Sequence, residues 1–175
     1  MRAGINPAPT DAKPMQSRPT RKGIRLPLPS YQEGNAFFIT IGTYMRHPWF
    51  LLHEELTNEA SRLLLQSSSD RGSRLYAWCI MPDHVHLLLQ DRNVVDFVRV
   101  FKGRMTPKAT YVEPGKKIWQ RSFHDHGLRK EENLEDVARY IWENPVRKGM
   151  VDHAPKYIWS GSQVWPNWRD FFGRE

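Results

Sequence analysis

The stretch RLYAWCIMPDHVHLLLQ (Arg74–Gln90) decides the fold of this chain. Arg74–Met81 is rich in apolar and aromatic residues, which predicts a strand, and His84–Gln90 predicts a second strand. Pro82–Asp83 between them predicts a tight turn, so the two strands should form an antiparallel hairpin. The apolar run Leu87–Leu89 is typical of a strand that is buried in a sheet.

Further elements flank this hairpin on both sides. Ala36–Tyr44 (AFFITIGTY) and Ile118–Arg129 predict two more strands. Apolar residues at helical spacing predict helices over Thr57–Ser68, Val94–Thr110 and Asn133–Glu143. The order is β-α-β-β-α-β followed by one more helix. We therefore expect an α+β, ferredoxin-like βαββαβ fold, with an antiparallel sheet, helices on one face and an additional C-terminal helix.

Local signals predict where the helices begin and end. Thr57 and Asn133 are residue types that cap helix N-termini. The serine-rich segment Ser67–Ser73 predicts a loop. Pro107 is expected to end or kink its helix, and Pro145 is expected to stop the last one.

Length and composition limit the classes of protein to which the chain can belong. The 175 residues fit one domain, and the net charge of +7 suggests a polyanionic partner. No apolar run approaches the roughly 18–20 residues that span a membrane, and no secretory signal is expected. The single cysteine, Cys79, allows no internal disulfide and is expected to be a small buried hydrophobic residue. We therefore predict a cytoplasmic protein without a membrane partner.

The charge is concentrated at the N-terminus. Residues 1–30 carry a net charge of +5 and six of the thirteen prolines, which predicts an extended or disordered basic arm. The arm is either a solubilising tail or a segment that lies along DNA phosphates. We divide the rest into a domain at 31–155 and a tryptophan-rich tail at 156–175.

The aromatic side chains of this tail allow two interpretations. They could stack on unpaired bases, or they could pack back onto the sheet or a helix. The residues in question are Tyr157, Trp159, Trp165, Trp168, Phe171 and Phe172.

His84 and His86 are the first candidates for chemistry. Alternate side chains of a strand project from the same face, so both imidazoles should lie together while Val85 points the other way. Two neutral imidazoles in this position can hold one divalent cation. The alternative is a pair of ordinary strand histidines. His124 and His126 form a second pair of the same kind.

The segment YIWENPVR (Tyr140–Arg147) is the second candidate. Tyr140 and Asn144 are four residues apart, so on a helix they would share a face. The phenol can act as a nucleophile, and the amide oxygen is a hard ligand suited to Mg²⁺ or Mn²⁺. Arg147 could hold a phosphate oxygen. Alternatively, Tyr140 only packs, and Asn144 before Pro145 is an ordinary helix end.

Together the two clusters resemble those of the single-tyrosine HUH transposases, and within them the REP-associated tyrosine transposases of bacteria. The resemblance lies in three blocks, namely AWCIMPDHVHLLLQ (Ala77–Gln90), IWQRSFHDHGLR (Ile118–Arg129) and ARYIWENPVRKGMV (Ala138–Val151). The order and spacing of these blocks match the family from about Asn35 to Val151. His124 ranks below the first pair because the family pattern places the metal ligands at His84 and His86.

This resemblance implies a function and roles for single residues. Tyr140 would be the nucleophile on the C-terminal helix, and a divalent metal, Mg²⁺ or Mn²⁺, would be held by His84, His86 and Asn144. The enzyme would cut single-stranded DNA beside a hairpin, leave a 5′-phosphotyrosine and a free 3′-hydroxyl, and rejoin the strand elsewhere. The residues that would contact DNA are Arg21, Lys22, Arg25, His126 and Arg147.

Two other functions remain open at this point. The chain could be an HUH nickase that starts replication or conjugative transfer, although such enzymes commonly have longer chains. It could also be a ferredoxin-like nucleic-acid-binding protein without catalysis, as are RNA-recognition modules. The enzyme could act as a monomer or as a homodimer.

Overall fold

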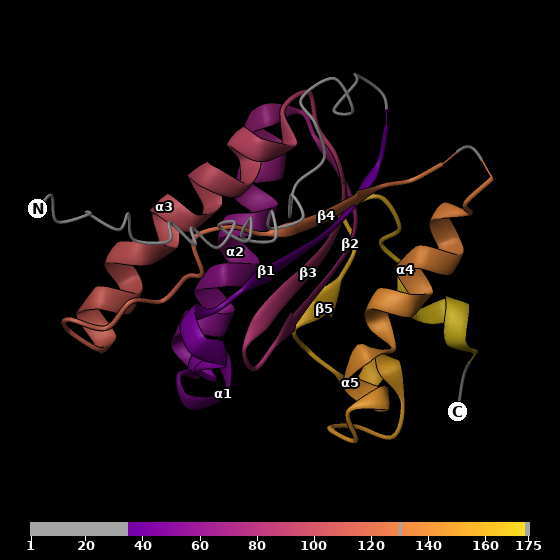
Figure 1. Ribbon diagram of the computed structural model, residues 1–175. Coiled ribbons are helices and arrows are strands. Elements are labelled where there is room, and N and C mark those ends of the chain that lie inside the picture. Colours follow the sequence, from indigo (N-terminus) through magenta and orange to yellow (C-terminus); the bar gives the residue numbers. More distant parts are fainter. Residues whose placement is uncertain (1–34, 130, 174–175) are drawn as a thin grey trace, which may run out of the picture.

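The computed structural model describes residues 35–129 and 131–173 (Figure 1). The predicted contact residues Arg21, Lys22 and Arg25 lie outside this part of the chain. The described residues form a five-stranded antiparallel sheet in the order β4-β1-β3-β2-β5. The strands are β1 (Phe37–Gly42), β2 (Arg74–Met81), β3 (His84–Gln90), β4 (His124–Gly127) and β5 (Ser160–Gly161). The first four strands have the ferredoxin-like order, so the expected fold class is confirmed.

Helices cover both faces of the sheet. The helices are α1 (Trp49–Leu52), α2 (Glu54–Arg71), α3 (Val94–Val112), α4 (Leu134–Trp142) and α5 (Asn144–Arg147). Short 3₁₀ turns lie at Tyr44–Arg46, Ala154–Lys156 and Trp168–Phe172. As Figure 1 shows, α2 and α3 lie on one side of the sheet, whereas α4 and α5 lie on the other. None of the helices in the described ranges has the length and apolarity needed to cross a bilayer.

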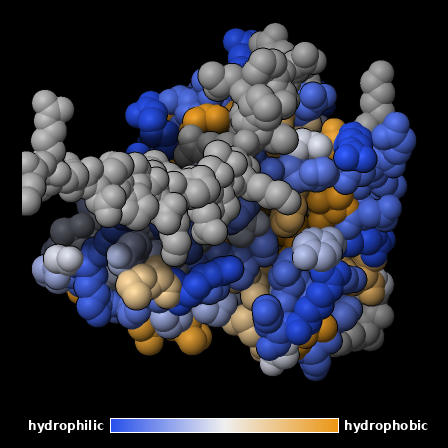
Figure 2. Space-filling view, viewed as in Figure 1, coloured by the Kyte–Doolittle hydropathy of each residue, from blue (hydrophilic) through white to orange (hydrophobic). Residues whose placement is uncertain are grey.

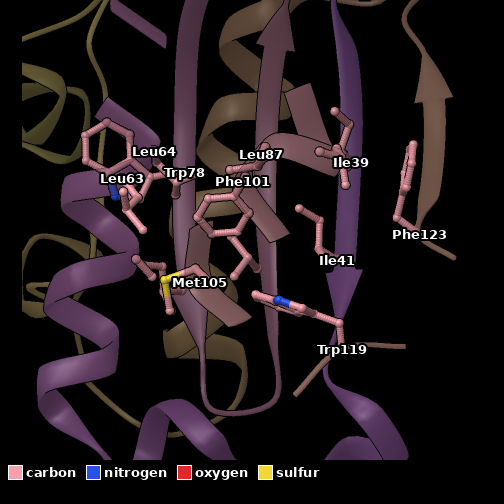
Figure 3. Packing of buried hydrophobic residues seen from close by; sticks show 14 of the residues in the cluster. Ile39, Ile41, Leu63, Leu64, Trp78, Leu87, Phe101, Met105, Trp119 and Phe123 are labelled. Atoms are coloured by element: carbon pink, nitrogen blue, oxygen red, sulfur yellow. The ribbon is translucent and has the colours of Figure 1, made fainter. Parts of the chain in front are cut away.

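The larger core lies between the sheet and the helices α2 and α3 (Figure 3). Ile39 of β1 and Leu87 of β3 point into it from the sheet, because both belong to the same set of alternating positions. Leu64 of α2 and Phe101 of α3 fill it from the opposite side. Each such side chain contributes about 1.5–3 kcal/mol on burial, so this layer fixes the sheet that carries the site.

A second core lies between the sheet and α4. Trp142 of α4 stacks on Trp168 with 4.8 Å between the ring centroids, and its Nε1 donates to the Gly161 carbonyl over 3.0 Å. The packing interpretation of the tail is thereby confirmed. Tyr157 and Trp168 are buried, and the other four rings of the tail are partly buried against the same cluster. The face of the molecule in Figure 2 is mostly hydrophilic, with hydrophobic residues in small groups.

The prediction for α2 was wrong at both ends. The helix begins at Glu54, and Thr57 is not its N-cap, because its buried hydroxyl donates to the Phe50 carbonyl over 2.7 Å. The helix also continues through most of the segment that was expected to be a loop. Ser68 is buried there and donates to Gln163 over 2.6 Å, a tertiary contact that outweighs the loop tendency of serine.

Other local predictions had mixed outcomes, and the fourth strand was predicted too long. The fourth strand is only His124–Gly127, although Trp119 forms an isolated bridge with Thr43. Pro107 does not end α3, which continues to Val112, because buried apolar residues hold the helix on both sides of it. Asn133 is confirmed as the N-cap of α4, where its side chain accepts a hydrogen bond from the Glu135 N–H. Cys79 is buried, as expected.

Candidate metal and nucleophile site

His84 and His86 lie side by side on β3, on the face of the sheet that α4 covers. Their Nε2 atoms are 2.9 Å apart. Two ligands that bind one ion at right angles with bonds of about 2.1 Å would be about 3.0 Å apart. The spacing of the two nitrogens therefore suits one shared cation.

The outer nitrogen of each ring has its own partner. His84 Nδ1 lies 2.5 Å from Asp83 Oδ1, and His86 Nδ1 lies 3.0 Å from Thr40 Oγ1. Arg46 donates to the other oxygen of Asp83 over 3.2 Å. Such partners fix the orientation and the tautomer of a metal-binding histidine, which leaves Nε2 facing the site.

Burial keeps both imidazoles neutral. Loss of water, together with the neighbouring His84 and Arg46, lowers the pKa of His86 to about 3. Burial also lowers the pKa of His84, although the carboxylate of Asp83 acts in the opposite direction. Both rings therefore present the unprotonated form that binds a metal at neutral pH.

Tyr140 lies on the exposed side of α4, close to this pair. Its ring meets Phe38 edge-on with 5.9 Å between the centroids, and Phe38 stacks on His86 at 5.3 Å. The guanidinium of Arg147 lies 4.2 Å from the centre of the Tyr140 ring and also donates to Glu143 over 2.7 Å. One phenyl ring therefore separates the candidate nucleophile from the candidate metal ligands.

Asn144 is buried where α4 passes into α5. Asn144 does not share one regular helix with Tyr140, since α4 ends at Trp142, which agrees with the alternative that Asn144 before Pro145 is a helix end. Asn144 Nδ2 donates to the carbonyls of Tyr140 and Ile141 over 2.8 and 3.3 Å. Pro145 has no N–H, so the Ile141 carbonyl four residues earlier has no helical donor. The Asn144 amide donates to this carbonyl instead. The side-chain oxygen of Asn144 lies on the other side of the amide and is the atom that could bind a cation.

The second histidine pair lies on the same face of the sheet but farther along it. Thr40 of β1 is opposite His86 on one side and His124 on the other. The two histidines are therefore two strands apart, or about 9–10 Å at ordinary strand spacing, which is too far for one ion. His126 Nε2 lies 3.0 Å from a carboxylate oxygen of Glu132.

Sequence reasoning missed several residues of this site. Asp83 directly precedes the histidines, so its position in the Met-Pro-Asp turn could have pointed to it. Thr40 and Phe38 gave no signal, because only the register between β1 and β3 brings them to His86. Within residues 35–129 and 131–173, no three His, Cys, Asp or Glu side chains form a metal-binding group.

Comparison with known proteins identifies relatives of the chain. A family model described as "Transposase IS200 like" matches residues 37–144. A Haemophilus influenzae protein assigned as a REP-associated tyrosine transposase is 31% identical over 146 residues, covering 74% of this chain and 81% of the relative. The REP-associated tyrosine transposase of Escherichia coli is 24% identical over 131 residues, with coverages of 74% and 78%.

The fold has a relative among solved structures as well. The structure of a REP-associated tyrosine transposase bound to a REP hairpin matches with a TM-score of 0.60 and 24% identity. The match covers 74% of this chain and 78% of the other. The family model spans both histidines, Tyr140 and Asn144, so the geometry described above lies within the matched region.

Proposed function

The chain belongs to the IS200-like transposase family, and we propose that it cuts and rejoins single-stranded DNA beside hairpin-forming, REP-like repeats. The observation that carries this proposal is the position of Tyr140, which one ring, that of Phe38, separates from His86. The names of the relatives refer to REP elements, and the solved relative is bound to a REP hairpin, which together support a repeat hairpin as the substrate.

In the proposed reaction, Tyr140 is the nucleophile. Its phenolic oxygen attacks the scissile phosphorus as the phenol proton leaves, and the bond from phosphorus to the 3′-oxygen breaks. The products are a 5′-phosphotyrosine and a free 3′-hydroxyl. Attack by another 3′-hydroxyl reverses the step and joins new strands, so no nucleotide cofactor is consumed. Arg147, beside the ring, could contact a phosphate oxygen.

His84, His86 and Asn144 would hold a divalent cation, Mg²⁺ or Mn²⁺. The donor types fit such an ion, because two neutral imidazoles converge and Asn144, whose Nδ2 already donates to the Tyr140 carbonyl, would supply an amide oxygen. When bound, the cation would polarise the scissile phosphate and stabilise the charge that develops on it. The protein's own contribution is to hold these ligands on a rigid sheet through Asp83 and Thr40.

Other residues would hold the DNA around the reacting phosphate. We propose that His126, on the same face of the sheet, and Arg147 contact the strand. We also propose that Arg21, Lys22 and Arg25 of the N-terminal arm contact the hairpin, on the basis of their charge. The protein would act in the cytoplasm as a monomer or a homodimer.

The first experiment tests the nucleophile. The wild-type chain is incubated with Mn²⁺ and a hairpin oligonucleotide labelled at its 3′ end, and a denaturing gel resolves protein-linked DNA. We expect a covalent adduct that disappears in Tyr140→Phe, because this variant lacks the attacking oxygen, and that also disappears when the metal is chelated. Tyr111→Phe is the matched control, since Tyr111 is an exposed tyrosine on α3.

The outcomes of this experiment separate the candidate functions. An adduct that persists in Tyr140→Phe would refute the nucleophile assignment. Hairpin binding by the wild type without any adduct would favour the non-catalytic alternative. Binding that is equally strong in Tyr140→Phe and the wild type would show that the substitution acts on chemistry and not on affinity.

A further inference from the structure

A surface pocket of about 460 Å³ lies outside the site described above. Its lining includes Tyr44, Met45, His47, Lys116 and Lys117. Its volume falls in the range of roughly 300–1,000 Å³ that is common for small-ligand sites. The proposed reaction gives this pocket no role.

The pocket lies at the end of the sheet that carries His84. Gly42, the last residue of β1, is opposite His84, and the next residue, Thr43, donates its N–H to the Asp83 carbonyl over 2.9 Å. The Tyr44 N–H donates to the Ile118 carbonyl over 2.8 Å. In Figure 1, α1 and the turn between β2 and β3 lie at this same end. The pocket and His84 therefore lie at the same end of the sheet.

The turn that forms the pocket has an unfavourable backbone. Met45 and Arg46 both adopt left-handed conformations, with φ of 52° and 57°, although neither is a glycine. This geometry leaves Met45 80% exposed and Tyr44 43% exposed, and it directs Arg46 toward Asp83 and His84. Such strain in a segment that displays apolar side chains beside a reactive site points to a ligand.

The exposed side chains offer complementary chemistry. The Tyr44 ring and the Met45 thioether present a face on which a flat base can stack. The ammonium of Lys117 lies 4.8 Å from the centre of the Tyr44 ring and can contact a phosphate. Glu113 does not oppose an anion strongly, because it forms an ion pair with Lys116 and a 2.7 Å contact with His53 Nε2.

We propose that this pocket binds one unpaired nucleotide of the DNA substrate, close to the scissile phosphate. This inference rests on the proposed function. The base stacks on Tyr44 and Met45, and Lys117 contacts its phosphate. Arg46 follows Met45 in the chain and contacts Asp83 and His84, so it would link the pocket to the metal site. The pocket thereby fixes which phosphate of the strand faces Tyr140.

Abasic nucleotides provide the test. Full-length Tyr140→Phe protein, which should not cut its substrate, is titrated with hairpin oligonucleotides that carry single-stranded flanks and one abasic position at a time. Fluorescence anisotropy measures each affinity. We expect one flank position at which loss of the base weakens binding about tenfold. Adding Tyr44→Ala should remove this difference, whereas Tyr111→Ala, at an 89% exposed tyrosine, should retain it.

A second variant tests the phosphate contact without disturbing the strained turn. Lys117→Ala should reduce the slope of log K against log salt by about 0.7, the value for one phosphate of a single strand. The proposal would be overturned if Tyr44→Ala left the dependence of affinity on the abasic position unchanged. It would also be overturned if Lys117→Ala left the slope of log K against log salt unchanged. Normal unfolding curves for both variants confirm that the fold is intact.

Failure of this proposal differs from failure of the proposed function. Suppose the wild-type chain forms the Tyr140 adduct, but Tyr44→Ala does not change how affinity depends on the abasic position. This result would contradict the nucleotide pocket and leave the proposed function intact. Suppose instead that the chain forms no adduct, but the loss of affinity at one abasic position depends on Tyr44. This result would contradict cleavage and support the nucleotide pocket.

Discussion

Asp83 shows how a side chain that has no direct role in the chemistry can set the site. Its carboxylate lies between the outer nitrogen of His84 and the guanidinium of Arg46. Alternation along a strand predicted that His84 and His86 would share a face, and this is confirmed. The rotation of each ring, however, depends on the partner of its Nδ1 atom, and this partner decides whether Nε2 faces the site.

We expect Asp83→Asn to weaken metal binding. An uncharged amide holds the His84 ring less firmly, and loss of such a partner typically costs about 10–100-fold in metal affinity. Titration of the full-length protein with Mn²⁺, followed by electron paramagnetic resonance, measures the free ion. Asp152→Asn is the control, since this carboxylate is exposed and pairs with Lys156. Equal Mn²⁺ affinity in both variants would contradict a positioning role for Asp83.

The helix α4 links Tyr140, the proposed nucleophile, to the C-terminal tail. Tyr140 is on its exposed side, whereas Trp142 is buried against Trp168 and donates to the carbonyl of Gly161 on the edge strand β5. Arg139 of the same helix donates to the Phe171 carbonyl over 2.5 Å. The position of Tyr140 over the sheet therefore depends on residues that follow it by about thirty positions in the chain.

Truncation of Trp168 should destabilise this layer. Trp168→Ala removes a buried ring, and such a change costs about 3–5 kcal/mol of the free energy of unfolding. Urea unfolding followed by far-UV circular dichroism measures it. Ile158→Ala, at an exposed residue of the tail, should change stability by no more than about 0.5 kcal/mol. A Trp168→Ala variant as stable as this control would show that the tail does not support α4.

The molecule as a whole is a sheet whose two faces are closed by different helices, and polar contacts join the layers at one end. Arg71 at the end of α2 donates to Asp91 after β3 and to Asp96 of α3, each over 2.9 Å. Burial raises the pKa of Asp91, but hydrogen bonds from Arg71, Ser73 and the Asn93 N–H outweigh it, so the pKa lies below its ordinary value of 3.8.

This cluster predicts how stability depends on pH. Because the folded state lowers the pKa of Asp91, its contribution is complete above about pH 4, the ordinary value, and is lost as the pH falls through the lower folded value. Asp91→Asn should therefore be less stable than the wild type at pH 7, with a smaller difference at pH 3. Urea unfolding at both values measures this. A difference that is independent of pH would contradict the assignment.

The sequence by itself determined the order of elements and the chemical types of the candidate residues. The hairpin, the position of β1, the N-cap of α4 and the shared face of His84 and His86 all follow from local pattern, because side-chain alternation and capping act within a few residues. The prediction of a loop at Ser67–Ser73 failed where a distant partner, Gln163, hydrogen-bonds Ser68.

Only the tertiary structure decided how these residues meet. Thr40 and Phe38 reach His86 through the register of β1 against β3, and Tyr140 reaches Phe38 because α4 packs on the face opposite α2 and α3. The strained turn at Met45 and Arg46 likewise became visible only in three dimensions. Pairing register and helix packing join residues far apart in the chain, and local sequence preferences carry no information about which distant segments will bury one another.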